Sequence, residues 1–276
     1  VAGAAAGVAA VFKTPATGAI YALEVPYQGD MARRMLLPAL VASASGYLTF
    51  VSLDDTVPLL NVGVFGTTGF ELIDLLGAVV IGVACAVGAR AFAKLMRSAK
   101  AAAHRSAYVR VPLATATLVG VFAVTRELTG QSLSLGPGYE VFRDWLFVEA
   151  DLTVWLILAV LALRCVAAAA TVAGGGVGGM FIPLVVAGGL LGRAIAEILH
   201  PEGFQLYTML GIAAFLGAGY RVPLAAVMFV AESTGRPHFI VPALFASVAA
   251  ELVMGGQSIT AFQRIAGPVS DIPERS

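Results

Sequence analysis

The most constraining feature of the sequence is the way its charged residues are distributed. They gather in a few short clusters, and long apolar runs with few charges separate them. A helix needs roughly 20 apolar residues to cross a bilayer. Runs that approach or reach this length span about 2–23, 35–51, 72–92, 109–124, 152–170, 180–198, 206–231 and 239–254. With 59% hydrophobic residues and a mean hydropathy of +0.88, the sequence predicts an all-α, multi-pass membrane protein.

Several of these runs are shorter than a straight membrane span or are interrupted by Pro15, Pro183 and Pro223. Interruptions of this kind are typical of tilted and broken helices that end near the middle of the bilayer. Alanine and glycine are frequent in the runs and allow helix backbones to approach closely. The sequence therefore predicts a compact bundle of tilted and broken transmembrane helices.

The charge clusters predict which side of the membrane each connection faces. The connection between the third and fourth runs, together with the ends of those runs, carries six bases and no acid: Arg90, Lys94, Arg97, Lys100, Arg105 and Arg110. The positive-inside rule places this loop in the cytoplasm, together with Arg33 and Arg34. The opposite side carries Asp54, Asp55, Glu140, Asp144, Glu149 and Asp151. The net charge is zero, which argues against a nucleic-acid partner.

The two cysteines, Cys85 and Cys165, both lie within apolar runs. We expect them to pack as small buried hydrophobes rather than to form a disulfide or a metal site. We expect no metal and no cofactor.

The chain contains an internal repeat. The segment GAAAGVAAVFKTPATGAIYALE, residues 3–24, matches GIAAFLGAGYRVPLAAVMFVAE, residues 211–232, position by position. The matched pairs include Phe12 with Tyr220, Lys13 with Arg221, Pro15 with Pro223, Tyr21 with Phe229 and Glu24 with Glu232. Repeated membrane elements that meet around a substrate site are the general plan of transporters and channels. Because the first copy begins at residue 3, we expect further transmembrane sequence before Val1.

A glycine-rich segment, AGGGVGGMFIP at residues 173–183, stands between two apolar runs. A helix N-terminus exposes unpaired N–H groups with partial positive charge, and glycines let an anion approach them. This pattern predicts an anion seat formed by Gly178, Gly179, Met180, Phe181, Ile182 and Pro183. The glycines are equally typical of a close helix crossing, and both interpretations stay open at this point.

The segment GGMFIP resembles the GxFxP motif of the CLC chloride channel and transporter family, through Gly179, Phe181 and Pro183. The repeat is similar to the paired segments in that family's two antiparallel halves. The resemblance implies a CLC-like bundle with an inverted internal repeat. Residues 1–266 would form part of the pore domain, comprising the end of the first repeat and the whole second repeat. Residues 267–276 would begin a cytoplasmic tail or linker.

The resemblance also implies the roles of individual residues. Backbone N–H groups of Met180 and Phe181 would line the central anion site. The family's pore tyrosine falls at Thr260 in GGQSITAFQ, and this hydroxyl could donate to an anion or act as a helix N-cap. The family motifs GSGIP and GKEGP do not occur in the sequence, and we expect them before Val1.

The resemblance implies chloride or a similar small anion as the substrate. It implies a homodimer with one pore per subunit in a lipid bilayer, and we expect the inner membrane of a bacterium. Exchangers of the family carry a second carboxylate after the position of Glu24, where this chain has Val25. Valine cannot transfer protons, which favours uncoupled, channel-like anion flow. A chloride/proton antiporter stays the alternative. Glu24 itself is expected to be a cytoplasmic charge at a helix end.

Two other classes of membrane protein fit the sequence less well. An intramembrane enzyme would need a serine beside a general base, but His104, His200 and His238 fall in the basic loop or at span ends. No catalytic residue is therefore expected. A small-molecule permease would need a polar intramembrane pocket, for which Arg164 is the one clear candidate.

Overall fold

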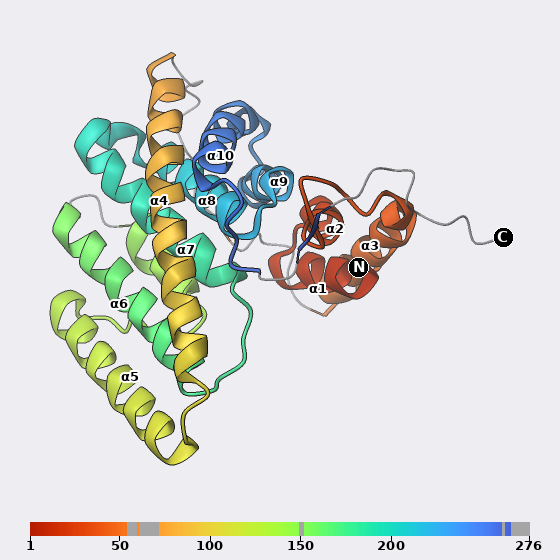
Figure 1. The fold of residues 1–276 in the computed structure, drawn as a ribbon. Helices are drawn as coiled ribbons and strands as arrows, with labels where there is room; N and C mark the ends of the chain where they lie inside the picture. The colour runs from red at the N-terminus through yellow and green to blue at the C-terminus, as the bar shows by residue number, and fades with distance from the viewer. Residues whose placement is uncertain (54–59, 61–71, 149–151, 261–262, 266–276) are drawn as a thin grey trace.

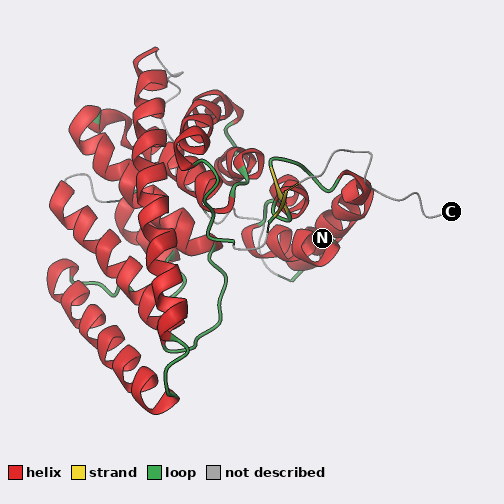
Figure 2. Cartoon of the chain, viewed as in Figure 1, coloured by secondary structure: helices red, strands yellow, loops and turns green. Residues whose placement is uncertain are grey.

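The structure is a computed structural model, and it describes residues 1–53, 60, 72–148, 152–260 and 263–265 (Figure 1). Ten α-helices are described: α1 Ala2–Phe12, α2 Pro15–Glu24, α3 Leu36–Val51, α4 Leu72–Ala102, α5 Ala107–Thr129, α6 Val154–Ala173, α7 Phe181–Leu199, α8 Phe204–Tyr220, α9 Pro223–Thr234 and α10 Ile240–Met254. Short turns of helix cover Arg33–Met35, Val141–Leu146, Pro201–Gly203 and Pro237–Phe239. Two short strands, β1 Tyr27–Gln28 and β2 Arg264–Ile265, pair in parallel beside α2 (Figure 2). The expected all-α architecture is confirmed.

Six segments of the described chain are long and apolar enough to cross a membrane. They are Arg33–Val51, Leu72–Ala102, Ala107–Thr129, Val154–Ala173, Phe181–Leu199 and Pro237–Met254. The two other expected runs are each broken into two shorter helices, α1 with α2 and α8 with α9. The chain is therefore a multi-pass integral membrane protein, and its breaks fall just before Pro15 and Pro223, as predicted.

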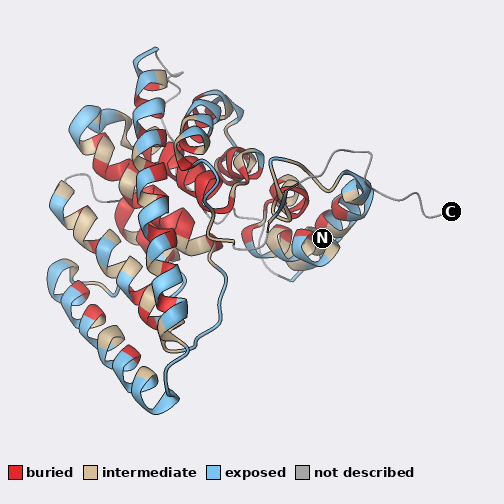
Figure 3. Cartoon of the chain, in the orientation of Figure 1, coloured by how far each residue is buried: buried red, intermediate tan, exposed pale blue. Residues whose placement is uncertain are grey.

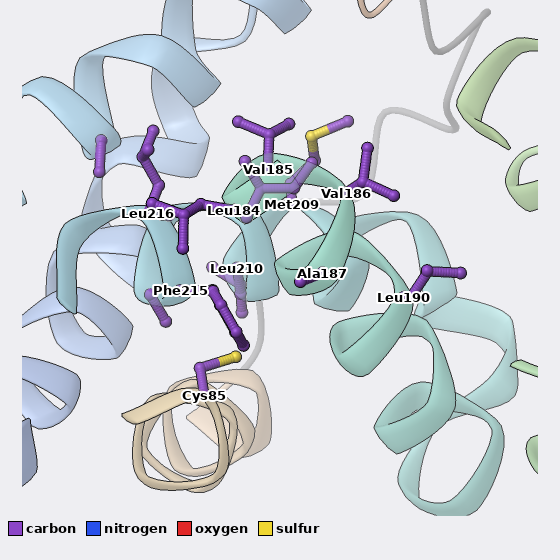
Figure 4. Close-up of a cluster of buried hydrophobic side chains, with 14 of the residues drawn as sticks. Cys85, Leu184, Val185, Val186, Ala187, Leu190, Met209, Leu210, Phe215 and Leu216 are labelled. Carbon is purple, nitrogen blue, oxygen red and sulfur yellow. The ribbon is translucent and has the colours of Figure 1, made fainter. Parts of the chain in front are cut away.

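The centre of the bundle is α8, which is buried without interruption from Tyr207 to Tyr220 (Figure 3). It packs against α4, α7, α9 and α10. In Figure 4, Cys85 of α4 lies beneath Phe215 of α8, and Leu184 of α7 lies beside Leu216 of α8. Cys85 is fully buried and Cys165 partly buried, and both are free thiols, as expected.

Glycines allow α7 and α8 to touch backbone to backbone. A Cβ atom added to Gly211 of α8 would lie 2.8 Å from Cα of Gly192 and still closer to the carbonyl oxygen of Gly188, both on α7. Real Cβ atoms do not approach backbone atoms this closely. Only glycine therefore fits at this contact, which fixes α7 at short range against the buried helix α8.

The outer helices have apolar faces that no described residue covers. Helix α5 runs along one edge of the bundle, next to α6, and is mostly exposed (Figures 1 and 3). Its exposed side chains include Val111, Leu113, Val119 and Val124. Such surfaces suit a lipid environment or a second subunit.

Helix α4 is longer than the sequence predicted. It continues to Ala102, so Arg90, Lys94, Arg97 and Lys100 lie on its last three turns and not in a loop. Lysine and arginine are good helix formers, and their long side chains reach water from a helix surface. Of the expected acidic cluster, Asp54, Asp55, Glu149 and Asp151 lie outside the described residues, as does the tail at 267–276.

The internal repeat appears in the backbone. The residue that follows α1, Lys13, has φ 57°, and the residue that follows α8, Arg221, has φ 58°. Both are in the left-handed conformation. Each is followed after one residue by a proline in the first turn of the next helix, Pro15 or Pro223. The two copies therefore break their helices at the same place and in the same way.

Each copy of the repeat also caps a helix of the other. The Glu232 carboxylate accepts hydrogen bonds from the Ala16 and Thr17 N–H groups at the start of α2, at 2.8 and 2.6 Å. The Glu24 carboxylate accepts hydrogen bonds from the Leu224 and Ala225 N–H groups at the start of α9, at 3.2 and 2.8 Å. The expectation of a cytoplasmic charge at position 24 was therefore wrong, because this carboxylate is buried and stabilises a helix N-terminus.

Candidate functional site

The glycine-rich segment leads into the N-terminus of α7. Met180 is the residue before the helix, Phe181 is its first residue, and Pro183 lies in the first turn as predicted. A Cβ atom added to Gly178 or Gly179 would meet no atom within 4 Å. These two glycines therefore border open space. The geometry favours an open approach to the helix end over a close helix crossing at this point.

A cavity of about 390 Å³ lies beside this approach. Four residues of the predicted site line it, Gly178, Gly179, Met180 and Thr260, and so does Val25. The remaining lining residues are Lys100, Tyr220, Ile259 and Gln263. Because Val25 and Lys100 share the cavity, the end of α2 and the basic end of α4 lie on one side of the bundle.

Helix α7 begins beside this cavity, directly after Met180. The Met180 N–H donates a hydrogen bond to the Tyr220 hydroxyl at 3.2 Å, and the Leu184 N–H donates to the Met180 carbonyl at 3.1 Å. No described side chain accepts a hydrogen bond from the Phe181 or Ile182 N–H group. A helix end of this kind carries partial positive charge without a full cation.

The Phe181 side chain is held in an aromatic cluster that the sequence did not predict. Its ring stacks on Phe12 at 4.5 Å between centroids and meets Phe229 at 5.3 Å and Tyr21 at 5.4 Å. All three partners come from the two copies of the repeat. The cluster fixes the ring and with it the backbone N–H group of Phe181. The aromatic matches between the copies were the sequence signal that could have revealed it.

Thr260 reaches the cavity, but its hydroxyl is engaged locally. The Thr260 and Ser258 hydroxyls are 2.6 Å apart, and the Thr260 N–H donates to the Ser258 hydroxyl at 3.1 Å. Gln263 donates to the carbonyl oxygens of Tyr220 and Val25, at 2.7 and 3.2 Å. The segment around Thr260 is thereby tied to the second copy of the repeat and to the residue that follows the first copy.

Arg164 belongs to a second cavity, of about 190 Å³, that Gly178, Gly179, Met180 and Pro183 also line. Its guanidinium donates to the carbonyl oxygens of Leu133 and Gly136. The Arg164 guanidinium thus holds the segment that precedes the turn at 141–146. A cation engaged with the backbone in this way does not favour the small-molecule permease.

These features define a class of protein: a helical membrane bundle in which a repeat holds an uncapped helix end against a cavity. Comparison with known proteins gives the family. The model of the voltage-gated chloride channel family matches residues 1–255, and the chain belongs to this family. Its members are transport proteins, as expected, and not enzymes.

Two curated relatives and two solved structures illustrate the likeness. A putative chloride channel protein ClcB-like from Ralstonia nicotianae is 25% identical, over 89% of this chain and 57% of the relative. The H⁺/Cl⁻ exchange transporter ClcA from Vibrio cholerae is 26% identical, over 94% of this chain and 57% of the relative. A CLC-type fluoride/proton antiporter superposes with a TM-score of 0.81 at 23% identity, over 96% of this chain and 64% of that one. A slow cyanobacterial Cl⁻/H⁺ antiporter gives 0.75 at 21% identity, over 94% and 62%. The chain thus spans a little more than half the length of its curated relatives.

Proposed function

We propose that the protein transports chloride or a similar small anion across a membrane through a CLC-type pore, with the N-terminus of α7 as the anion seat. The observation that carries this proposal is the cavity beside Gly178, Gly179 and Met180. It borders Met180, the residue before α7, and its lining includes a lysine and, among the described residues, no carboxylate. The family and the names of the relatives support chloride as the substrate.

The seat is suited to transport because it holds an anion without binding it tightly. Partial charges at a helix N-terminus attract an anion weakly enough for it to leave again. Lys100 is exposed and lines the same cavity, so it adds an attractive potential at the entrance. The seat comprises the backbone of Gly178, Gly179, Met180, Phe181 and Ile182, with Pro183 in the first turn and Thr260 across the cavity.

We propose further that anion flow is not coupled to protons, as in a channel. Val25 lines the cavity and offers no titratable group. The neighbouring Glu24 carboxylate accepts hydrogen bonds from two backbone N–H groups of α9, and we assign it a structural role. The alternative is chloride/proton exchange, which the names of the ClcA relatives favour.

Reconstitution of the full-length protein in liposomes tests both points. Chloride efflux and internal pH are followed in the same vesicles under an imposed chloride gradient. We expect chloride efflux with no proton movement. Stoichiometric proton movement against its gradient would establish the exchanger. Absence of any anion flux would overturn the seat at α7.

The proposed setting is the inner membrane of a bacterium, with two copies of the chain forming a dimer that has one pore per subunit. Exposed apolar faces such as that of α5 support a lipid or subunit contact. Light scattering of the protein in detergent tests the dimer, and a monomer mass would contradict it.

A further inference from the structure

Tyr220, at the end of α8, brings a hydroxyl group to the α7 N-terminus. Its oxygen accepts the hydrogen bond of the Met180 N–H group at 3.2 Å. The side chain is 8% exposed and lines the 390 Å³ cavity. Tyr220 is therefore buried at the proposed seat, and no motif in the sequence assigns it a role there.

The position of this hydroxyl is fixed from three directions. A Cβ atom on the preceding Gly219 would lie 2.8 Å from the Leu184 side chain, so the end of α8 lies against the first turns of α7. Gln263 holds the Tyr220 carbonyl oxygen at 2.7 Å. The Tyr21 ring meets the Tyr220 ring edge to face at 5.8 Å. These contacts hold the phenol against the end of α7.

A phenol has one proton to donate and can accept hydrogen bonds on its oxygen. The Tyr220 oxygen already accepts the Met180 N–H group. The proton of this hydroxyl is left to donate, and no described residue accepts it.

The cavity offers a place for an acceptor of this proton, because Tyr220 lines it. An anion in the cavity would therefore receive a hydrogen bond from the Tyr220 hydroxyl. The contacts with Leu184, Gln263 and Tyr21 keep the phenol in place for it.

We propose that the Tyr220 hydroxyl is an anion ligand beside the α7 N-terminus, in place of an aromatic side chain at position 260. The proposal rests on the anion transport proposed above. The Thr260 hydroxyl, across the cavity, is engaged with Ser258 at 2.6 Å.

Chloride binding to the full-length protein in detergent, measured by isothermal titration calorimetry, tests this. In Y220F the ring stays and the hydroxyl is lost. We expect the chloride Kd to rise about tenfold, which corresponds to about 1.4 kcal/mol. The stoichiometry reports the folded fraction independently of Kd, so a partly unfolded variant still yields a result.

Two matched variants serve as controls. Y21F removes a neighbouring hydroxyl but leaves Tyr220 able to donate, and Y108F removes an exposed hydroxyl outside the cavity lining. We expect both to stay within about threefold of the wild-type Kd.

A hydroxyl that only competes with the anion for the Met180 N–H group gives the opposite result, because Y220F would then bind chloride more tightly. Tighter or unchanged binding in Y220F overturns the proposal, as does an equal loss in Y21F. If the wild-type protein neither binds nor transports anions, the proposed function itself fails. Wild-type binding with an unaffected Y220F removes only the role of Tyr220.

Discussion

Replacing Glu24 or Glu232 with glutamine tests the reciprocal caps between the two copies of the repeat. Each carboxylate presents two oxygens to the N–H groups of a helix start, at 2.6 to 3.2 Å. Glutamine keeps one accepting oxygen but places an NH₂ group, itself a donor, where the other oxygen was. Each variant therefore loses one charge-assisted hydrogen bond and the attraction between the charge and the helix end.

A hydrogen bond to a charged group contributes about 1.5–3 kcal/mol, and a charge at a helix N-terminus adds up to about 2 kcal/mol when partly buried. We therefore expect each substitution to cost about 2 kcal/mol or more. For a chain of this size, 1 kcal/mol corresponds to roughly 2–4 °C in Tm. E24Q and E232Q should each melt about 4–8 °C below the wild-type protein.

The assay is thermal unfolding of the full-length protein in detergent, with E202Q as the control. Glu202 is exposed on a short helical turn, and its substitution should leave Tm unchanged. The caps also predict that E24Q lowers Tm without altering the ratio of protons to chloride in liposomes. An E24Q protein that melts like the wild type but changes proton movement would refute the capping role and restore Glu24 as a proton carrier.

Three further predictions follow from the packing and the cavity. G211A adds a Cβ atom 2.8 Å from an α7 backbone carbon and should cost at least 1–3 kcal/mol of stability. G120A, which meets no atom within 4 Å, should melt at or slightly above the wild-type temperature in the same detergent assay. K100Q should slow chloride flux two- to threefold at low ionic strength and match wild type near 1 M salt, while R97Q, outside the cavity lining, should change flux less. V25E places an acid in the cavity, so chloride flux in liposomes should become dependent on pH where wild-type flux is flat.

The sequence predicted the helices and their breaks because the physics behind them is local. Apolar runs of spanning length have few alternatives in a bilayer, and Pro15 and Pro223 cannot continue the helices before them. The main error in a helix boundary was at the end of α4. There a cluster of bases was interpreted as a loop, although the helix continues through it. Charge predicts which side of the membrane a segment faces, but not whether the helix has ended.

The site was predicted in part for the same reason. The glycine-rich approach to Met180 and Phe181 is contiguous in sequence, so its geometry follows from helix-end chemistry. The contribution of Tyr220 could not be predicted, because it depends on how closely α8 approaches α7 in space. Glu24 was misinterpreted because its partners are 200 and 201 residues away along the chain.

The glycine contact between α7 and α8 has a consequence for gating. Side chains can change rotamer and allow helices to slide, but two backbones in direct contact have nothing between them that can rearrange. The end of α7 and the Tyr220 hydroxyl should therefore move as one rigid body. Opening and closing of the pathway must then come from elements that move around this pair, and a cross-link between α7 and α8 should leave the conducting state reachable.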